Sequence, residues 1–321
     1  MSSAVKVIIS LAGCYALTAL FVPVLLPLLV RLKAGQSIRE EGPAAHMAKS
    51  GTPTIGGLSF VLAIVIVSLA VCGFDYDMLV MLAGLLGYGA IGFADDYVKV
   101  VKKRNLGLTA KQKIAAQLAV ALLISWYASK SGTTVFIPFA KTLVDLKWFY
   151  IPFMVFIFLA MSNSVNLTDG LDGLASSVTA VCASCFAIIG YAAGADSMAC
   201  FMAAVAGGCL GFLLYNRHPA KLFMGDTGSM ALGGALAAGA IISGYELLLP
   251  IAGGIYVAEA VSVIIQVFVF KTQNGRRFFR MAPLHHHFEL GGWDEVKVVR
   301  VFTAVTLLLS LIALAGVLSV R

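Results

Sequence analysis

Acidic and imidazole side chains that could take part in phosphate chemistry occur in four short motifs of this chain. Carboxylate oxygens with no cysteine nearby favour Mg²⁺ over zinc, and Mg²⁺ typically joins one or two carboxylates to substrate phosphates. The chain lacks the GxxxxGK[ST] loop of P-loop proteins. These residues therefore predict Mg²⁺-dependent phosphoryl or phosphoglycosyl transfer. The motifs are GFADDYVKV with Asp95 and Asp96, NLTDGLDGL with Asp169 and Asp172, FMGDTGS with Asp226, and PLHHHFELGG with His285, His286 and His287.

The elements that position these motifs are predicted to be membrane-spanning helices. The chain has 321 residues, of which 60% are hydrophobic and 12% are charged, and its mean hydropathy is +0.93. Apolar runs of about 20 residues are long enough to cross a bilayer as helices, and the alternation typical of strands is absent. We therefore expect an all-α integral membrane protein with a single polytopic domain over residues 1–321. Ten spans are expected, near residues 4–30, 54–73, 77–94, 113–129, 148–165, 172–193, 197–215, 227–245, 248–270 and 298–320.

The distribution of basic residues predicts the orientation of these spans. Eighteen of the 23 lysines and arginines follow odd-numbered spans, and such residues are enriched in cytoplasmic loops. Both termini are therefore expected outside, on the periplasmic side, and all four motifs on the cytoplasmic face. The net charge of +7 is concentrated on that face, where it favours anionic lipid or substrate. No nucleic-acid partner is expected.

At this point the motifs resemble those of a known family. GTPTIGG (51–57), GFADDYVKV, NLTDGLDGL, FMGDTGS and PLHHHFELGGWDEVKVV (283–299) are similar to the phospho-N-acetylmuramoyl-pentapeptide transferases. The likeness runs from near residue 31 to the end of the chain. Three of the motifs are shared with the wider superfamily of polyprenyl-phosphate N-acetylhexosamine-1-phosphate transferases, and the HHHFE segment indicates the muramoyl-pentapeptide branch.

The resemblance implies a fold, a reaction and a location. The fold would have ten spans, both termini periplasmic and a cytoplasmic active site, in the bacterial inner membrane. The reaction would convert undecaprenyl phosphate and UDP-MurNAc-pentapeptide, with Mg²⁺, into lipid I and UMP. A homodimer is among the expected partners, together with the lipid bilayer. Gly253 and Gly254 predict a bend in segment 248–270 that would shape a groove for the lipid tail.

The resemblance also assigns roles to individual positions. Asp95 and Asp96 resemble the catalytic pair, Asp226 a catalytic residue and the Mg²⁺ ligand, and His285 an essential site residue. Lys111 falls where the family has a phosphate-facing lysine. The other expected substrate-binding residues are Asp172, Asn216 and Phe223 in the uridine pocket, with Phe223 stacking on the base, and Lys49, Thr54, Asn166, Asp169, Gln266 and His286.

The roles of the two adjacent aspartates stay open at this stage. Neighbouring residues on a helix point about 100° apart, so Asp95 and Asp96 cannot both face one atom unless the helix has ended. We expect one carboxylate near the attacking lipid phosphate and the other bracing the metal or a cation such as Lys111. Direct attack by the lipid phosphate and a phospho-enzyme formed on one aspartate are both possible.

Two other functions fit parts of the sequence. A sister transferase that uses UDP-N-acetylglucosamine would share the acidic motifs, but the HHHFE segment separates it from the muramoyl-pentapeptide branch. A secondary transporter would explain Glu259 in the predicted ninth span. Transporter sites, however, lie near the midplane of the membrane, whereas most acids here lie at span ends.

Overall fold

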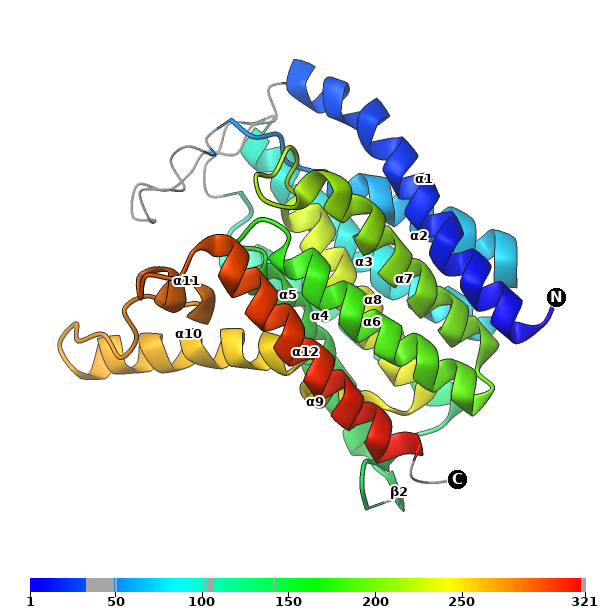
Figure 1. Ribbon diagram of the computed structural model, residues 1–321. Helices are drawn as coiled ribbons and strands as arrows, with labels where there is room; N and C mark the ends of the chain where they lie inside the picture. Colours follow the sequence, from blue (N-terminus) through cyan, green and yellow to red (C-terminus); the bar gives the residue numbers. More distant parts are fainter. Residues whose placement is uncertain (33–48, 50, 101, 103–106, 141, 319–321) are drawn as a thin grey trace.

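The computed structural model describes the chain except residues 33–48, 50, 101, 103–106, 141 and 319–321. It is a helical bundle, and a helix occupies each of the ten predicted positions (Figure 1). The longer helices are α1 (Ser3–Arg31), α2 (Gly57–Cys72), α3 (Tyr76–Val100), α4 (Ala110–Ala128), α5 (Tyr150–Thr168), α6 (Leu174–Ala193), α7 (Asp196–Asn216), α8 (Gly225–Ser243), α10 (Gly254–Thr272) and α12 (Glu295–Leu318). The short elements are η2 (Ser129–Ser131), β1 (Thr134–Ile137), β2 (Thr142–Asp145), η3 (Lys147–Phe149), η4 (Glu246–Leu248), α9 (Leu249–Ala252) and α11 (Leu284–Glu289).

Among the described residues, eight helices are long and apolar enough to cross a membrane. They include α1, α3, α5, α6, α7, α10 and α12, and α4 together with the 3₁₀ turn that follows it. The chain is therefore a multi-pass membrane protein. The two other predicted spans are helices as well: α2 is apolar but only 16 residues long, and α8 is the central helix of the bundle.

Helix α8 is surrounded by other helices. Fifteen of its nineteen residues are buried, and it packs against α3, α5 and α2. Its sequence is rich in Gly and Ala, which lets neighbouring helices approach closely. The closest approach is at Gly92 of α3, where an added Cβ atom would lie only 2.1 Å from the backbone oxygen of Asp226. A glycine at position 92 thus brings the end of α3 directly against the start of α8.

Two features differ from the sequence prediction. Helix α3 continues to Val100, so Asp95 and Asp96 lie on its last turns and not beyond its end. The expected loop before α5 contains an antiparallel hairpin of β1 and β2, so the fold is not purely α. The amide of Phe136 in this hairpin donates to the carbonyl of Gly244 at 2.9 Å, which attaches the hairpin to the end of α8.

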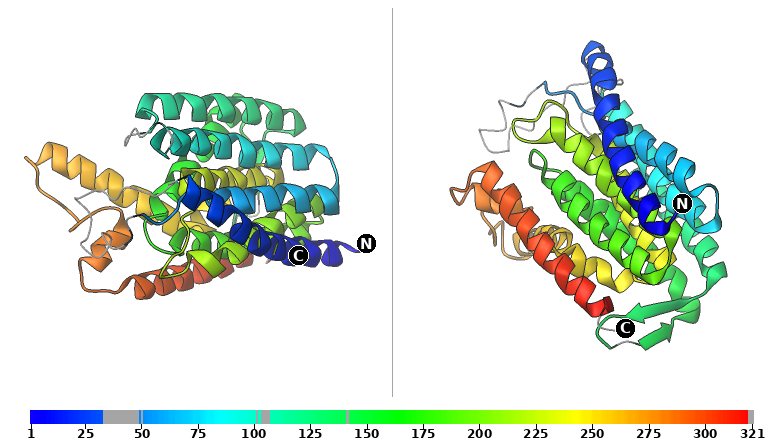
Figure 2. Two further views of the ribbon diagram at one scale, coloured as in Figure 1. Left: turned by 90° about the horizontal axis from the view of Figure 1, so that it is seen from above. Right: turned by 45° about the vertical axis from the view of Figure 1, so that its right-hand side comes forward.

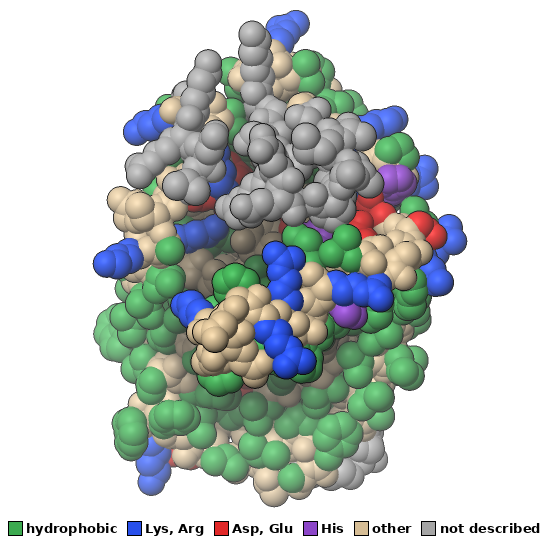
Figure 3. Space-filling model, turned by 90° about the vertical axis from the view of Figure 1, so that its left-hand side faces the viewer, with side chains coloured by type: hydrophobic (Ala, Val, Ile, Leu, Met, Phe, Trp, Pro, Cys, Tyr) green, Lys and Arg blue, Asp and Glu red, His purple; other side chains and the backbone are tan. Residues whose placement is uncertain are grey.

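The predicted bend near Gly253 is present. Helix α9 ends at Ala252, and α10 begins at Gly254 and extends away from the bundle (Figures 1 and 2). In the most apolar 18-residue stretch of α10 only 22% of the residues are buried, so most of this helix is exposed. The side of the molecule drawn in Figure 3 is mainly hydrophobic in its lower part, whereas most of its Lys and Arg side chains lie in the upper and middle parts.

Candidate active site

Three aspartates converge where α3 meets α8. One carboxylate oxygen from each of Asp95, Asp96 and Asp226 lies within 4.8 Å of the others. Asp95 and Asp96 are almost fully buried, with exposed fractions of 2% and 3%. The crossing at Gly92 produces this arrangement, because it holds the last turns of α3 beside the first turn of α8. Two motifs 130 residues apart thus form one acidic centre.

Asp226 is the most heavily contacted member of this centre. Its Oδ2 atom accepts hydrogen bonds from Lys99 at 2.9 Å and from Lys113 at 2.8 Å. Its Oδ1 atom accepts a hydrogen bond from the amide of Asn166 at 2.7 Å. The same Asn166 amide also donates to Ser229, one turn further along α8. Asp226 is thus oriented by groups from α3, α4 and α5.

Asp95 and Asp96 have different partners. Asp96 accepts hydrogen bonds from the backbone amides of Asp226 (3.2 Å) and Thr227 (2.9 Å) and from the Thr227 hydroxyl (2.6 Å). It therefore caps the N-terminal turn of α8, where a carboxylate is favoured by the unpaired amides and the helix dipole. Asp95 instead faces Lys99, 2.5 Å away, and accepts a hydrogen bond from the amide of Leu108.

The acidic centre has the donor set expected for a hard divalent cation. Among the described residues, three carboxylates face the two ammonium groups of Lys99 and Lys113, so negative charge exceeds positive charge in this part of the site. The Oδ2 atom of Asp95 is buried, and its close partner among the described residues is the Lys99 ammonium, 2.5 Å away, without a hydrogen bond in good geometry. Buried polar atoms normally have hydrogen-bond partners, so this oxygen is also a suitable metal ligand. The residues present therefore fit Mg²⁺, with Asp226 and Asp95 as the candidate ligands.

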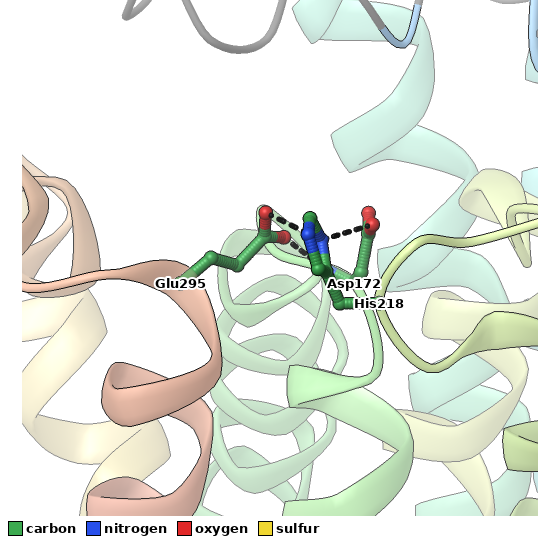
Figure 4. A group of neighbouring side chains, drawn as sticks. All are labelled: Asp172, His218 and Glu295. Carbon is green, nitrogen blue, oxygen red and sulfur yellow. Dashed lines mark hydrogen bonds and ion pairs between the residues drawn. The ribbon is translucent and has the colours of Figure 1, made fainter.

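A second cluster lies nearby on the same end of the molecule. Asp172 follows α5, His218 follows α7 and Glu295 begins α12, and the three side chains point toward one another (Figure 4). The ammonium of Lys49 lies 2.7 Å from Asp172 and 2.6 Å from Glu295. Asp169 is electrostatically coupled to both clusters. Burial, and then repulsion from Asp226, Asp96 and Asp172, raises the pKa of Asp169 well above its ordinary value of 3.8.

His285 is buried beneath the loop that carries Asp169 and Asp172. Its Nδ1 atom lies 3.1 Å from a carboxylate oxygen of Glu259 on α10. The same carboxylate accepts hydrogen bonds from the backbone amides of Leu284 (2.7 Å) and His285 (3.2 Å). An added Cβ atom on Gly170 would lie 2.2 Å from the Nε2 atom of His285. The histidine is thus held between Glu259 and a position where only glycine leaves room for the ring.

Comparison of the sequence with known proteins identifies the family to which the chain belongs. Residues 78–244 match the model of glycosyl transferase family 4. A phospho-N-acetylmuramoyl-pentapeptide-transferase of Desulforamulus reducens is 54% identical over 311 residues, covering 94% of this chain and 93% of the relative. Its namesakes from Caldanaerobacter subterraneus (54% identical, 88% and 90% covered) and Halalkalibacterium halodurans (50%, 96% and 96%) are similarly close. The chain belongs to the phospho-N-acetylmuramoyl-pentapeptide transferase family.

Other family positions predicted from the sequence also lie at this end of the molecule. Thr54 is buried beside Gly225, and Phe223 is half-buried; none of the ring pairs found in the described part of the chain involves Phe223, so its face is not taken by another aromatic ring. Asn216 is buried and donates to the carbonyl of Leu222, so it shapes the loop that carries Phe223. The substrate contacts of these residues stay a prediction.

The remaining predicted residues have partners within the chain or face solvent. Gln266 bonds to the backbone of Phe279, and the Nδ1 atom of His286 lies 2.8 Å from Glu289. Lys111 is exposed on the first turn of α4. The cations that brace the acidic centre are Lys99 and Lys113, and not Lys111 as the sequence suggested. The role of Lys111 toward substrate stays a prediction.

Sequence reasoning missed five residues that contact the predicted ones. Of these, Lys99 carried a local signal, because it lies four residues after Asp95 and adjacent helical turns place such pairs together. Glu295 lies inside the motif at residues 283–299, but it meets its partners, like the other three, only through the packing of separate segments. The five residues are Lys99, Lys113, His218, Glu259 and Glu295.

Proposed function

We propose that this transferase moves phospho-MurNAc-pentapeptide from UDP-MurNAc-pentapeptide to undecaprenyl phosphate, giving lipid I and UMP in peptidoglycan synthesis. Family membership over 94% of the chain supports the reaction. The observation that carries the proposal is the buried acidic centre of Asp95, Asp96 and Asp226 beside Lys99 and Lys113. Phosphoryl transfer needs positioned charge more than covalent chemistry, and this centre supplies charges of both signs.

The proposed setting is the bacterial inner membrane, with ten spans and both termini periplasmic. The concentration of basic residues after odd-numbered spans supports this orientation. A prenyl tail could stay among the lipids while its phosphate meets the soluble nucleotide at the cytoplasmic end. The exposed apolar faces of α10, which include Ile264 and Phe268, would border the tail. A homodimer stays a prediction.

Mg²⁺ is the proposed cofactor, held by Asp226 and Asp95. When bound, it would neutralise charge on the phosphate oxygens of the nucleotide. Lys99 and Lys113 would hold the Asp226 carboxylate in place and offer further positive charge to the phosphates. Asn166 would fix the other oxygen of Asp226 through its hydrogen bond.

The different partners of the two adjacent aspartates support different roles. Asp96 has its carboxylate engaged by three hydrogen bonds from α8, so we assign it to holding Asp226 in position. Asp95 is not engaged by α8; it faces Lys99 and accepts a hydrogen bond from the amide of Leu108, so we assign it to the reacting phosphates. A phosphomonoester has a second pKa of about 6, so a lipid phosphate is largely dianionic at neutral pH and Asp95 need not remove a proton.

The chemical route is proposed as direct attack of the lipid phosphate on the β-phosphorus of the nucleotide. The bond from that phosphorus to the bridging oxygen breaks, and UMP leaves with the oxygen. Attack by Asp95 to form a phospho-enzyme is the alternative. Net inversion at phosphorus would exclude the covalent route, and net retention would exclude direct attack.

The contacts of Glu259 argue against a transporter. An ionisable residue in a membrane helix suggests an ion pathway when its partners are unknown. Here the carboxylate caps α11 through two backbone amides and holds His285. A positioning role for the site histidine therefore explains this acid.

Release of UMP is the test of the proposed function. Purified protein with polyprenyl phosphate and Mg²⁺ would be incubated in parallel with UDP-MurNAc-pentapeptide and with UDP-N-acetylglucosamine. We expect UMP only from the first nucleotide. Release only from the second would assign the chain to the sister transferases, and release from neither would favour transport.

A further inference from the structure

Four side chains form a closed ring of opposite charges beside the acidic centre. Asp172 and Glu295 each contact the same two cation-forming groups through different oxygens. Lys49 Nζ contacts Oδ1 of Asp172 at 2.7 Å and Oε1 of Glu295 at 2.6 Å. On the opposite side, His218 Nδ1 contacts Oδ2 of Asp172 at 3.0 Å and Oε2 of Glu295 at 3.2 Å. Figure 4 shows the imidazole standing between the two carboxylates. We call these residues the four-residue ring.

The contacts fix the tautomer of His218. Its Nδ1 atom faces two carboxylate oxygens, and carboxylates only accept hydrogen bonds. The Nδ1 atom must therefore carry the proton, because a lone pair there would be repelled by both acids. Half of the side chain remains exposed, so the other ring edge is accessible to a ligand.

The backbone completes the ring and ties it to the site loops. The amide of Asp172 donates to Glu295 at 2.5 Å, and the amide of Ala220 donates to Asp172 at 3.0 Å. Glu295 is the first residue of α12, where a negative charge is favoured by the helix dipole. The ring therefore joins the segment before α2, the loops after α5 and α7, and the start of α12.

The ring contains its own cations and does not call for a metal ion. Asp172, His218 and Glu295 have ligand atoms within 4.8 Å of one another. The ammonium of Lys49, however, already lies against one oxygen of each carboxylate. A divalent ion would have to displace it, so charge balance is met by the protein.

We propose that His218 and Glu295 are positioning residues for the nucleotide-binding half of the site. They hold Asp172 and Lys49, the two members of the ring that the sequence predicted to bind substrate, in fixed orientations. The ligand is a uridine nucleotide, and the ring acts on its binding without touching the reacting phosphates. This inference rests on the proposed function, because only a nucleotide substrate gives the ring a ligand to orient.

The substitution Glu295→Gln tests the ring with little change of shape. One oxygen becomes an amide donor, which would face either the Lys49 ammonium or the Nδ1–H of His218, so one side of the ring is lost. We expect about a tenfold weaker binding of UMP by calorimetry, the size expected from losing one charge-assisted hydrogen bond. The KM for UDP-MurNAc-pentapeptide would rise by the same factor, with kcat and the KM for polyprenyl phosphate nearly unchanged.

Two substitutions of His218 test its donor geometry. His218→Ala removes the Nδ1–H donor and should weaken UMP binding about as much as Glu295→Gln. In His218→Asn the side-chain amide reaches the position of Nδ1 and should restore most of the lost affinity. The side chain of His218 is 42% exposed, so these variants are expected to fold. They therefore test the proposal even if Glu295→Gln fails to fold.

Asp294→Asn is the matched control. Asp294 is the exposed acid next to Glu295, and it bonds the amide of Lys297 at the start of the same helix. Its variant should bind UMP as the unaltered protein does.

Four outcomes would overturn the proposal: unchanged UMP affinity in Glu295→Gln, an equal loss in Asp294→Asn, no recovery in His218→Asn, or a fall in kcat alone. Absence of UMP binding by the unaltered protein would overturn it as well. UMP binding without turnover of either UDP-sugar would refute the proposed function, while the binding data on the variants would still decide the ring.

Discussion

The Oδ2 atom of Asp96 accepts two hydrogen bonds from Thr227, at 2.9 Å from the backbone amide and at 2.6 Å from the hydroxyl. Both residues are buried, with exposed fractions of 3% and 1%. The carboxylate of Asp96, the second aspartate of GFADD, therefore contacts the first turn of α8 at Thr227, the residue that follows Asp226. This contact shows which of the two adjacent carboxylates faces α8, a choice that the sequence alone left open.

Thr227→Val should lower both stability and activity. It removes a hydroxyl that donates to a buried carboxylate, and such a bond contributes about 1.5–3 kcal/mol. The thermal midpoint in detergent should fall by several degrees, and UMP release should fall because Asp226 loses its fixed position. Thr306→Val is the control, since that hydroxyl donates only to the carbonyl of Phe302 in its own helix. Equal losses in the two variants would contradict the role of Asp96.

Removal of the metal ion or of Asp226 should abolish turnover without unfolding the protein. A chelator should stop UMP release, and added Mg²⁺ should restore it. Asp226→Ala should lower kcat at least a hundredfold, about 2.7 kcal/mol or more of transition-state stabilisation. A cooperative thermal transition should persist in this variant, although Lys99, Lys113 and Asn166 lose their hydrogen-bond acceptor. Substantial activity in Asp226→Ala would rule out this residue as the principal ligand.

Lys113→Met should impair the reaction far more than Lys111→Met. The ammonium of Lys113 bonds Asp226 at 2.8 Å, whereas Lys111 is exposed on the same helix. We expect kcat to fall by more than tenfold in the first variant, since hydrogen bonds to charged groups contribute about 1.5–3 kcal/mol. The second variant should change kcat less than threefold. The reverse order would support the phosphate-facing role that the resemblance implies for Lys111.

Gly170→Ala should inactivate the protein by displacing a histidine. The added methyl group would overlap the Nε2 atom of His285, which is fixed from below by Glu259. We expect a loss of activity of at least tenfold, checked by UMP release. Gly13→Ala is the matched control, because the nearest atoms to its new methyl group lie at an ordinary 3.7 Å. Normal activity in Gly170→Ala would show that His285 is not needed in its observed position.

Glu246, at the end of the molecule opposite the acidic centre, should make the stability of the protein depend on pH. The residue is 1% exposed, and neither carboxylate oxygen accepts a hydrogen bond from another described side chain. Burial raises the pKa of Glu246 from 4.5 to about 8. Between these values the folded state keeps a proton that the unfolded state has lost, so stability is greatest below pH 4.5 and falls as pH rises toward 8.

The expected slope is about 1.4 kcal/mol per pH unit across that window. Thermal midpoints measured from pH 5 to pH 9 in unaltered protein and in Glu246→Gln would check it. The glutamine keeps the shape and cannot ionise, so its midpoint should vary less with pH and be higher at pH 8. Parallel curves for the two proteins would refute the assignment.

Much of the site could be predicted from the sequence because its chemistry is concentrated in short motifs. Asp95, Asp96, Asp169, Asp172, Asp226 and His285 were expected on one membrane face, and in the structure they lie at one end of the bundle. The distribution of basic residues predicted that they would lie together, whereas the orientation of the spans in the membrane stays a prediction. The separate roles of Asp95 and Asp96 could not be predicted from the sequence, because they depend on which side of α3 packs against α8.

The parts that could not be predicted depend on tertiary contacts. The apolar run of α3 ends at Ala94, but the helix continues because Asp95 pairs with Lys99 one turn further on. His218 lies in a loop with no recognised motif of its own, and Glu295 lies inside the motif at residues 283–299 without a role assigned to it. Only the packing of separate segments brings them to Asp172. Strands β1 and β2 are four residues each, too short for a clear alternation.

The contact between Gly92 and the backbone of Asp226 has a consequence for how the charges act during the reaction. With no room between α3 and α8, Asp95 and Asp226 cannot separate or approach freely when charge moves among the phosphates. Dipoles and charges fixed in advance need little reorganisation at the moment of bond exchange. Two helices in backbone contact thus give this membrane protein a preorganised electrostatic environment.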